Sequence, residues 1–245
     1  MDSLLTAAAS GMRARMEALD LVANNIANTG TAGFKLDRES YNLYVAPEAL
    51  DPDSPAPSTL PVVERNWTDF GQGSLESTGN PLDVALAGPG FLAVSGPGTT
   101  LYTRNGNLSL SPAGVLTTSD GYPVVATGGG TIQLQPDLPF EIASDGTVKQ
   151  AGADVGQLAV FDSDRPGTLV KFGRNYFETA DGAALATPAA GTRVEQGKVE
   201  ASNVAAPESA VRLISLMRQF EMLQKAIAMD GDMARQAIEQ VAKPS

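Results

Sequence analysis

The chain of 245 residues contains no cysteine and no histidine. Without cysteine, disulfides and thiolate metal sites are excluded, and cysteine usage leaves the redox compartment open. Without histidine, the chain lacks the usual zinc ligand, the usual general base near neutral pH and any Ser/His/Asp triad. These two absences exclude many hydrolytic and zinc-dependent sites.

Basic residues are also scarce, with 17 Lys and Arg against 28 Asp and Glu. A nucleic-acid partner is therefore not expected, because phosphate binding needs a basic surface. The ends are neutral: residues 1–35 hold three basic and three acidic side chains, and residues 205–245 hold five of each. The excess of negative charge lies between residues 36 and 204, which suits densely packed ends and a solvent-facing middle.

Long apolar runs are missing, so direct membrane insertion is not expected. The first residues, Met1 to Leu4, include no basic leader, and Arg13 and Arg15 interrupt the segment that follows. This pattern is not that of a cleavable signal peptide. If the protein leaves the cytoplasm, we expect export by a route that does not read such a signal.

Apolar residues recur at alternating steps of four and three in residues 3–27. This spacing predicts a helix of roughly 35–40 Å with a heptad seam along one side. Asn28, Gly30 and Gly33 favour its end, because they readily adopt left-handed backbone conformations. The N-terminal seam consists of Leu5, Ala9, Met12, Met16, Leu19, Ala23 and Ile26.

The C-terminal segment carries a second seam with the same spacing. Gly231, beside Asp230, predicts a kink or loosening, since glycine weakens a helix by about 1 kcal/mol relative to alanine. One such seam is typical of a core-facing helix. Two seams at opposite ends of a chain favour helices that pair with each other and with neighbouring subunits. The C-terminal seam consists of Leu213, Leu216, Phe220, Leu223 and Ile227.

The middle of the chain has short apolar or alternating runs separated by tight-turn pairs such as Asn105-Gly106 and Asp145-Gly146. This pattern predicts an antiparallel β domain. Five prolines within residues 46–61 indicate a linker or exposed loop. The predicted fold is α+β. Its N- and C-terminal helices pair as a coiled coil, and a central antiparallel β domain lies between them in the sequence. The predicted boundaries are 1–35 and 205–245 for the terminal helical domain, 36–66 for the linker or extended loop, and 67–204 for the β-rich outer domain.

No segment has the spacing of a catalytic, cofactor-binding or metal-binding motif. Gly128-Gly129-Gly130 is not followed by the lysine of a phosphate-binding loop, and Asp162 with Asp164 does not extend into a calcium loop. We expect no enzyme activity and no cofactor. The alternatives from other classes are a secreted β-rich polysaccharide hydrolase and an adhesin-like binding module. Both leave the two terminal seams unexplained, and the hydrolase would need a converging carboxylate pair.

Three segments, in order, resemble signatures of the flagellar rod and hook family of axial proteins. The first is Ser10-Gly11-Met12 with 24–28 and 31–35, the second runs from Gly73 to Thr117, and the third is Ser202-Asn203-Val204 followed by Leu213 to Lys225. Within the family, the run from Leu213 to Met222, with Phe220, is more similar to proximal than to distal rod proteins. The distal rod protein is the alternative within the family.

The resemblance implies a structural subunit of the flagellar basal-body rod. Its terminal helices would form an inner coiled-coil layer and its β domain would lie outside. It implies helical polymerisation into the drive shaft that carries torque to the hook. The implied partners are further copies of the chain, other rod subunits and the flagellar type III export apparatus, with a location in the rod, across the periplasm. Both seams, with Asn24, Asn25 and Asn28, would form the assembly interface. For the asparagines, end-of-helix chemistry is the alternative to inter-subunit hydrogen bonds.

Overall fold

The computed structural model describes residues 2–45, 59–163, 165–173, 175–185, 187–189 and 191–242. Within these ranges, it leaves undescribed the side chains of residues 2–8, 40–45, 59–65, 187, 188, 230, 234 and 236–242. The predicted α+β class is confirmed: an antiparallel β domain lies in the sequence between an N-terminal and a C-terminal helix.

The described chain divides into two units. The helical unit comprises the described parts of 1–27, 37–67 and 205–245, and the β unit comprises those of 28–36 and 68–204. Residues 36–66 were expected to form a linker or extended loop. The described part of this segment instead contributes to two strands that belong with the helices. Of the prolines on which the linker prediction rested, Pro61 lies in the strand Thr59–Thr68, and Pro47, Pro55 and Pro57 lie outside the described residues.

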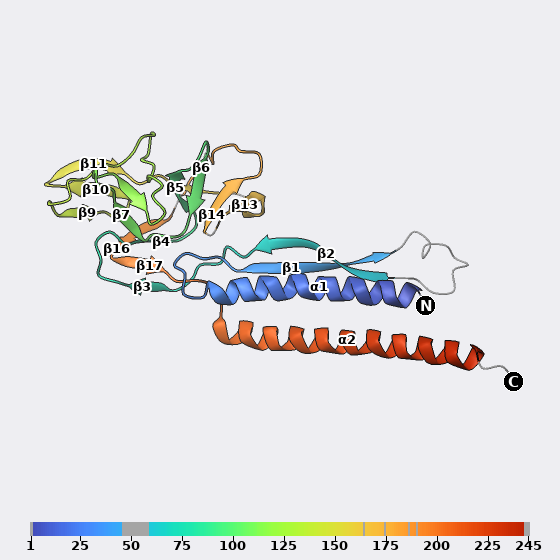
Figure 1. The fold of residues 1–245 in the computed structure, drawn as a ribbon. Coiled ribbons are helices and arrows are strands. Elements are labelled where there is room, and N and C mark those ends of the chain that lie inside the picture. Colours follow the sequence, from blue (N-terminus) through green and yellow to red (C-terminus); the bar gives the residue numbers. More distant parts are fainter. Residues whose placement is uncertain are drawn as a thin grey trace. The chain divides into compact units, whose positions relative to one another are not determined.

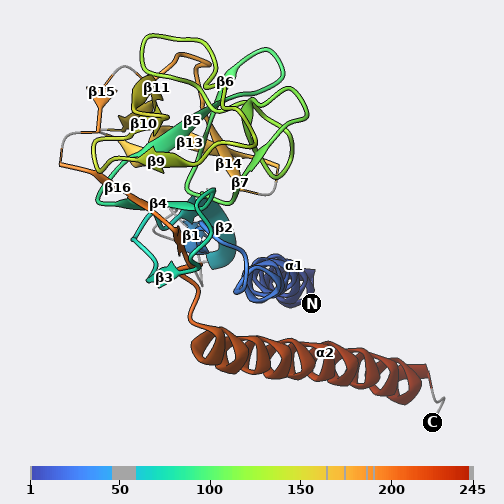
Figure 2. The same ribbon diagram turned by 90° about the vertical axis from the view of Figure 1, so that its left-hand side faces the viewer.

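The helical unit is built from two long helices and one small sheet. Figures 1 and 2 show the sheet and the C-terminal helix on different sides of the N-terminal helix. The C-terminal helix has 37 residues and continues through Gly231. The predicted kink or loosening there does not interrupt it, because a cost of about 1 kcal/mol for one glycine is small for so long a helix. The elements are α1 (Asp2–Ala27), β1 (Asp37–Val45), β2 (Thr59–Thr68) and α2 (Ala206–Ala242).

The β unit contains a six-stranded antiparallel sheet in the order β13-β14-β6-β5-β12-β15, a three-stranded sheet β11-β10-β9, and the pairs β16-β4, β17-β3 and β7-β8. A 3-10 helix at Pro166–Thr168 precedes β13. The strands are β3 (Leu75–Ser77), β4 (Val84–Ala87), β5 (Phe91–Ser95), β6 (Thr100–Thr103), β7 (Leu108–Leu110), β8 (Leu116–Thr118), β9 (Phe140–Ile142), β10 (Thr147–Gln150), β11 (Ala153–Gln157), β12 (Val160–Asp162), β13 (Leu169–Phe172), β14 (Tyr176–Thr179), β15 (Thr187–Pro188), β16 (Arg193–Gln196) and β17 (Lys198–Glu200).

Both faces of the central strands are buried, because successive residues of a strand point to opposite sides and each side has its own apolar cluster. The two hydrophobic clusters draw on nearly every strand between β4 and β16. Members that are at most 1% exposed are Val84, Leu92, Val94, Leu101, Leu116, Val124, Ile132, Val148, Ala93, Tyr102 and Phe177.

The β unit contains a buried cluster of three charged side chains. We call Lys35, Arg104 and Glu200 the Glu200 cluster. The Lys35 ammonium donates to one Glu200 oxygen at 2.5 Å, and the Arg104 guanidinium donates to the other at 3.1 Å. The side chains of Lys35 and Glu200 are 0% exposed, and that of Arg104 is 5% exposed. Burial lowers the pKa of Lys35 and of Arg104, and the charge of Glu200 opposes both shifts.

Backbone carbonyls accept further hydrogen bonds from the two cations of this cluster. Lys35 also donates to the carbonyl of Gly71 at 2.8 Å, and Arg104 donates to the carbonyl of Gly88 at 2.8 Å. Close to it, the backbone N–H of Gly33 donates to the carbonyl of Glu200 at 2.6 Å. Gly33 has φ +67°, and an added Cβ would lie 2.3 Å from the backbone of Arg104, so only glycine fits there.

A second buried polar group lies at Tyr176. Its hydroxyl donates to the Asp120 carboxylate at 2.7 Å and lies 2.9 Å from the Thr118 hydroxyl. The ring packs edge-on against Tyr122, with centroids 5.2 Å apart. Burial raises the pKa of Tyr176 well above its usual value near 10, and burial also raises the pKa of Tyr102.

We expect Glu200→Gln to lower the free energy of unfolding of the β unit by about 3–5 kcal/mol, because two buried cations lose their counter-charge. Urea titration with hydrogen exchange at the amides of β5 and β8 would measure the loss. The matched control is Glu195→Gln, whose carboxylate is 29% exposed and pairs with Lys198 at 2.7 Å. That control should cost less than about 1 kcal/mol. Equal losses in the two variants would contradict the role of the Glu200 cluster.

The raised pKa of Tyr176 makes the β unit sensitive to alkali. The folded state favours the neutral phenol of Tyr176. The contribution of this group to the free energy of unfolding is therefore fully present below pH 10 and declines as the pH rises above it. We expect Tyr176→Phe to lower stability at pH 8 by about 1 kcal/mol and to flatten the decline above pH 10. Part of the decline with pH should remain in this variant, because burial also raises the pKa of Tyr102. Urea midpoints from pH 8 to 12 test this, and an unchanged slope would refute it.

Candidate assembly surface

The two helices pack against each other through a small apolar cluster. Ala18 and Val22 of α1 lie against Leu216 of α2, and Leu19, Ile26 and Leu213 adjoin them. Towards the N-terminus, a methyl group on Gly11 would lie 3.8 Å from the side chain of Leu223. The later residues of α1 thus lie near the start of α2, and the earlier residue Gly11 lies near a later residue of α2. The two helices therefore run antiparallel, as Figure 1 shows.

The stripe of α1 that is buried within the chain differs from its predicted seam. Ala14, Ala18, Val22 and Asn25 are 0–5% exposed. They follow one another at steps of four, four and three, and thus occupy one face of the helix. Small side chains at 14 and 18 leave room for the neighbouring elements to approach closely.

The predicted seam of α1 is displaced from that stripe by about a quarter to a third of a turn. Ala9 and Ala23 are exposed, and Met16 is 53% exposed. Met12, Leu19 and Ile26 are partly buried. The side chain of Leu5 lies outside those that the structure describes. The fold of one chain therefore leaves much of this seam uncovered.

The predicted seam of α2 is the face that lies towards α1. Leu216 is 4% exposed, and the four others are partly buried: Leu213, Phe220, Leu223 and Ile227. Because this face carries the larger side chains, it supplies most of the apolar volume between the helices.

The opposite face of α2 is also apolar, and it is exposed. Val211 is 68% exposed, and Met222, Met229 and Met233 are 61–62% exposed. Steps of eleven, seven and four place these four residues on one side of a helix. We call them the outer face of α2. Ser215 and Arg218 lie between Val211 and Met222 on the same side, so the apolar surface is interrupted there. Exposed apolar patches mark interaction sites in soluble proteins.

A shallow hollow lies at the first turns of this helix. It has a volume of about 650 Å³ and is lined by Pro207, Glu208, Val211, Arg212 and Ser215. Arg212 pairs with the carboxylate of Glu39 from β1, whose side chain is 2% exposed. The hollow thus extends the outer face towards the start of α2, with an ion pair at its border.

The three asparagines singled out in the sequence have different surroundings. The amide of Asn25 donates to the Asp37 carbonyl at 2.8 Å and accepts from the Asp37 N–H at 3.0 Å. Asn25 therefore fixes the start of β1 beside α1 within the chain. The side-chain oxygen of Asn28 accepts from the Thr31 hydroxyl at 3.1 Å, which is end-of-helix chemistry. Asn24 is exposed.

Among the described residues, no group of three or more Asp or Glu side chains is arranged to hold a metal ion. No helix in the described part of the chain combines the length and hydropathy that a membrane span needs. The sequence reasoning missed the Glu200 cluster, although Lys35 and Arg104 fall within the motifs quoted for the resemblance, and it missed the outer face of α2.

The chain thus combines an antiparallel β domain with two terminal helices that expose apolar side chains. Three family models match. Residues 5–35 match "Flagella basal body rod protein", residues 85–150 match "Flagellar hook protein FlgE/F/G D1 domain", and residues 195–240 match "Flagellar basal body rod FlgEFG protein C-terminal".

Relatives cover the whole chain. The flagellar basal-body rod protein FlgF of Caulobacter vibrioides is 34% identical, with 99% of each chain covered. FlgF of Mesorhizobium japonicum is 30% identical, with 100% of each covered. FlgG of Bacillus subtilis is 30% identical, covering 94% of this chain and 95% of the relative.

The chain belongs to the flagellar basal-body rod protein family. It is a structural rod subunit of the basal body of the flagellum, serves motility, and is not an enzyme. It assembles with other rod subunits. The hydrolase and binding-module alternatives are not favoured.

We expect Leu216→Ala to lower the stability of the helical unit by about 2–4 kcal/mol, because it removes the largest fully buried side chain between α1 and α2. The matched substitution Met222→Ala, on the outer face, should change it by about 0.5 kcal/mol or less. Helical circular dichroism during urea titration at low protein concentration measures both. Similar losses for the two variants would show that the exposed and buried faces of α2 are wrongly assigned.

Proposed function

We propose that the terminal helices of this rod subunit pair with those of neighbouring subunits as a coiled coil and form the inner layer of a helical polymer. In this role, the β unit lies outside that layer, and the polymer is the drive shaft that carries torque to the hook. The single observation that carries the proposal is the outer face of α2, where four apolar side chains are more than 60% exposed in the described chain.

The uncovered seam of α1 adds a second surface of the same kind, with Met16 at 53% exposed. Burying one large apolar side chain contributes about 1.5–3 kcal/mol. Association itself costs on the order of 4–15 kcal/mol in lost translational and rotational freedom. One such contact is therefore insufficient, whereas two long apolar surfaces on one subunit can exceed the cost when both are buried together.

The proposed assembly interface comprises both predicted seams and the outer face of α2. Within the seams, Leu213, Leu216 and Leu223 already contact α1 in the single chain. Their proposed contribution is to hold α1 and α2 together as one docking element. Met16, Ala9 and Ala23 are proposed to contact the neighbours directly, since they are exposed. Alanines at such positions allow close approach of helices.

We further propose that the subunit is a proximal rod protein and that the flagellar type III apparatus exports it with its N-terminus uncleaved. The first part follows the resemblance of residues 213–222, with Phe220, and the second follows the resemblance of the whole chain to rod proteins. Mass analysis of the protein recovered from purified basal bodies tests the N-terminus. Accumulation in cells that lack the export apparatus tests the route.

We expect Met222→Glu to weaken self-association at least tenfold without unfolding the subunit, because a charge would have to be buried in an apolar contact. Sedimentation velocity across a concentration series measures the association. The matched control is Val170→Glu on β13, where valine is 49% exposed and lies in the β unit. It should associate like the parent. Equal association of Met222→Glu and the parent would overturn the outer face as an assembly surface.

A further inference from the structure

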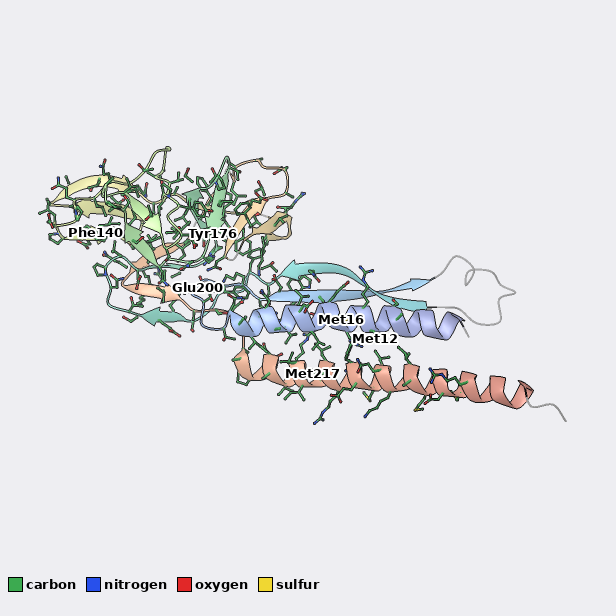
Figure 3. The ribbon with its side chains drawn as sticks, in the orientation of Figure 1. Met12, Met16, Phe140, Tyr176, Glu200 and Met217 are labelled. Carbon is green, nitrogen blue, oxygen red and sulfur yellow. The ribbon has the colours of Figure 1, made fainter. Side chains whose placement is uncertain are left out.

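The methionines of this chain are confined to its terminal segments. All seven lie in residues 1–16 or 217–233, and residues 17–216 contain none. Figure 3 shows Met12 and Met16 on α1 and Met217 on α2. The five that are half exposed or more are Met16 at 53%, Met217 at 50%, Met222 at 61%, Met229 at 62% and Met233 at 61%.

These thioethers are the most readily oxidised groups that the chain presents. The sequence has no cysteine, so no thiol competes for the oxidant. A peroxide transfers one oxygen atom to the sulfur: the thioether becomes a sulfoxide, and hydrogen peroxide becomes water. The reaction needs only access of the oxidant to sulfur, and the exposed fractions of the five side chains provide it.

The product differs from methionine in the property that the proposed interface uses. Methionine is apolar and flexible, and it adapts to an irregular apolar partner. A sulfoxide is polar and chiral, and burying it without a hydrogen-bond partner is unfavourable. Met222 and Met229 are seven residues apart on the outer face, so oxidation places polar groups along the same side of α2.

We propose that Met16, Met217, Met222, Met229 and Met233 form an oxidation site through which peroxides block assembly of the free subunit, and that reduction of the sulfoxides restores it. The inference rests on the proposed function, because the sulfoxides at Met16, Met222, Met229 and Met233 act by spoiling the proposed assembly interface. Met217 is exposed on another side of α2 and is oxidised with them. Subunits already in a polymer are protected, since their thioethers are buried. The β unit contains no methionine and keeps its fold.

The test uses the full-length chain and hydrogen peroxide. Peptide mass mapping follows the gain of one oxygen at each methionine, and sedimentation velocity follows association before and after treatment. We expect oxidation at the five positions to weaken association at least tenfold, with the β-unit amides unchanged in hydrogen exchange. Incubation with methionine sulfoxide reductases A and B and a dithiol should restore the original association, since the dithiol becomes a disulfide and the sulfoxide oxygen leaves as water.

The matched variant replaces the five methionines by leucine, which keeps apolar surface and helix propensity but cannot form a sulfoxide. It should associate with or without peroxide. A parallel variant with glutamine at the five positions should associate weakly without any peroxide. If the treated parent carries the five sulfoxides and associates normally, or if peroxide leaves these sulfurs unmodified, this inference is overturned and the proposed assembly surface stands. If the untreated parent and the leucine variant both stay monomeric at all concentrations, the assembly surface itself is wrong.

Discussion

The carboxylate of Glu200 holds two buried cations that come from distant parts of the sequence. Lys35 is 165 residues away from it and Arg104 is 96 residues away. Removing the carboxylate leaves two buried cations without their ion-pair partner, although Asp69 still attracts Lys35 and Asp162 still attracts Arg104. The β unit therefore depends strongly on this one side chain. Lys35 follows α1 in the sequence and Glu200 precedes α2. The β unit is thus complete only when the segments next to both helices have joined it.

The helical unit depends on a different constraint. Its buried cluster is small, with Ala18, Val22 and Leu216 at the centre, while α2 alone has 37 residues. Most helical stability in proteins comes from packing of an apolar face rather than from intrinsic propensity. Few of the α2 side chains that the structure describes are buried, so in the proposed assembly the molecules that cover this helix supply much of its stabilisation. Under that proposal the two units differ in role: one folds around its own core, and the other keeps apolar surface for neighbouring subunits.

The sequence predicted the parts of this fold that depend on local pattern. Heptad spacing predicted both helices, Gly33 and its neighbours predicted the end of α1, and tight-turn pairs predicted an antiparallel domain. Its failures concern contacts that periodicity cannot specify. The buried stripe of α1 includes Asn25 and small alanines, so the larger residues of the neighbouring seam dominated the pattern. The Glu200 cluster joins residues far apart in sequence, and charge patterns do not indicate which of 28 acidic residues is buried. Strands β1 and β2 lay in a segment whose prolines suggested a linker.

The placement of methionine fits the same difference in role. In a closed core, packing favours side chains with few rotamers, and the β unit uses valine, leucine, isoleucine and aromatic residues there. A surface that is completed by another molecule must adapt to a partner held in place by many other contacts, and a flexible thioether does so with little strain. The same exposed sulfur is open to oxidants until the partner arrives. Under the proposed assembly, adaptability and chemical vulnerability therefore have one cause, which is that neighbouring subunits complete the packing of α1 and α2.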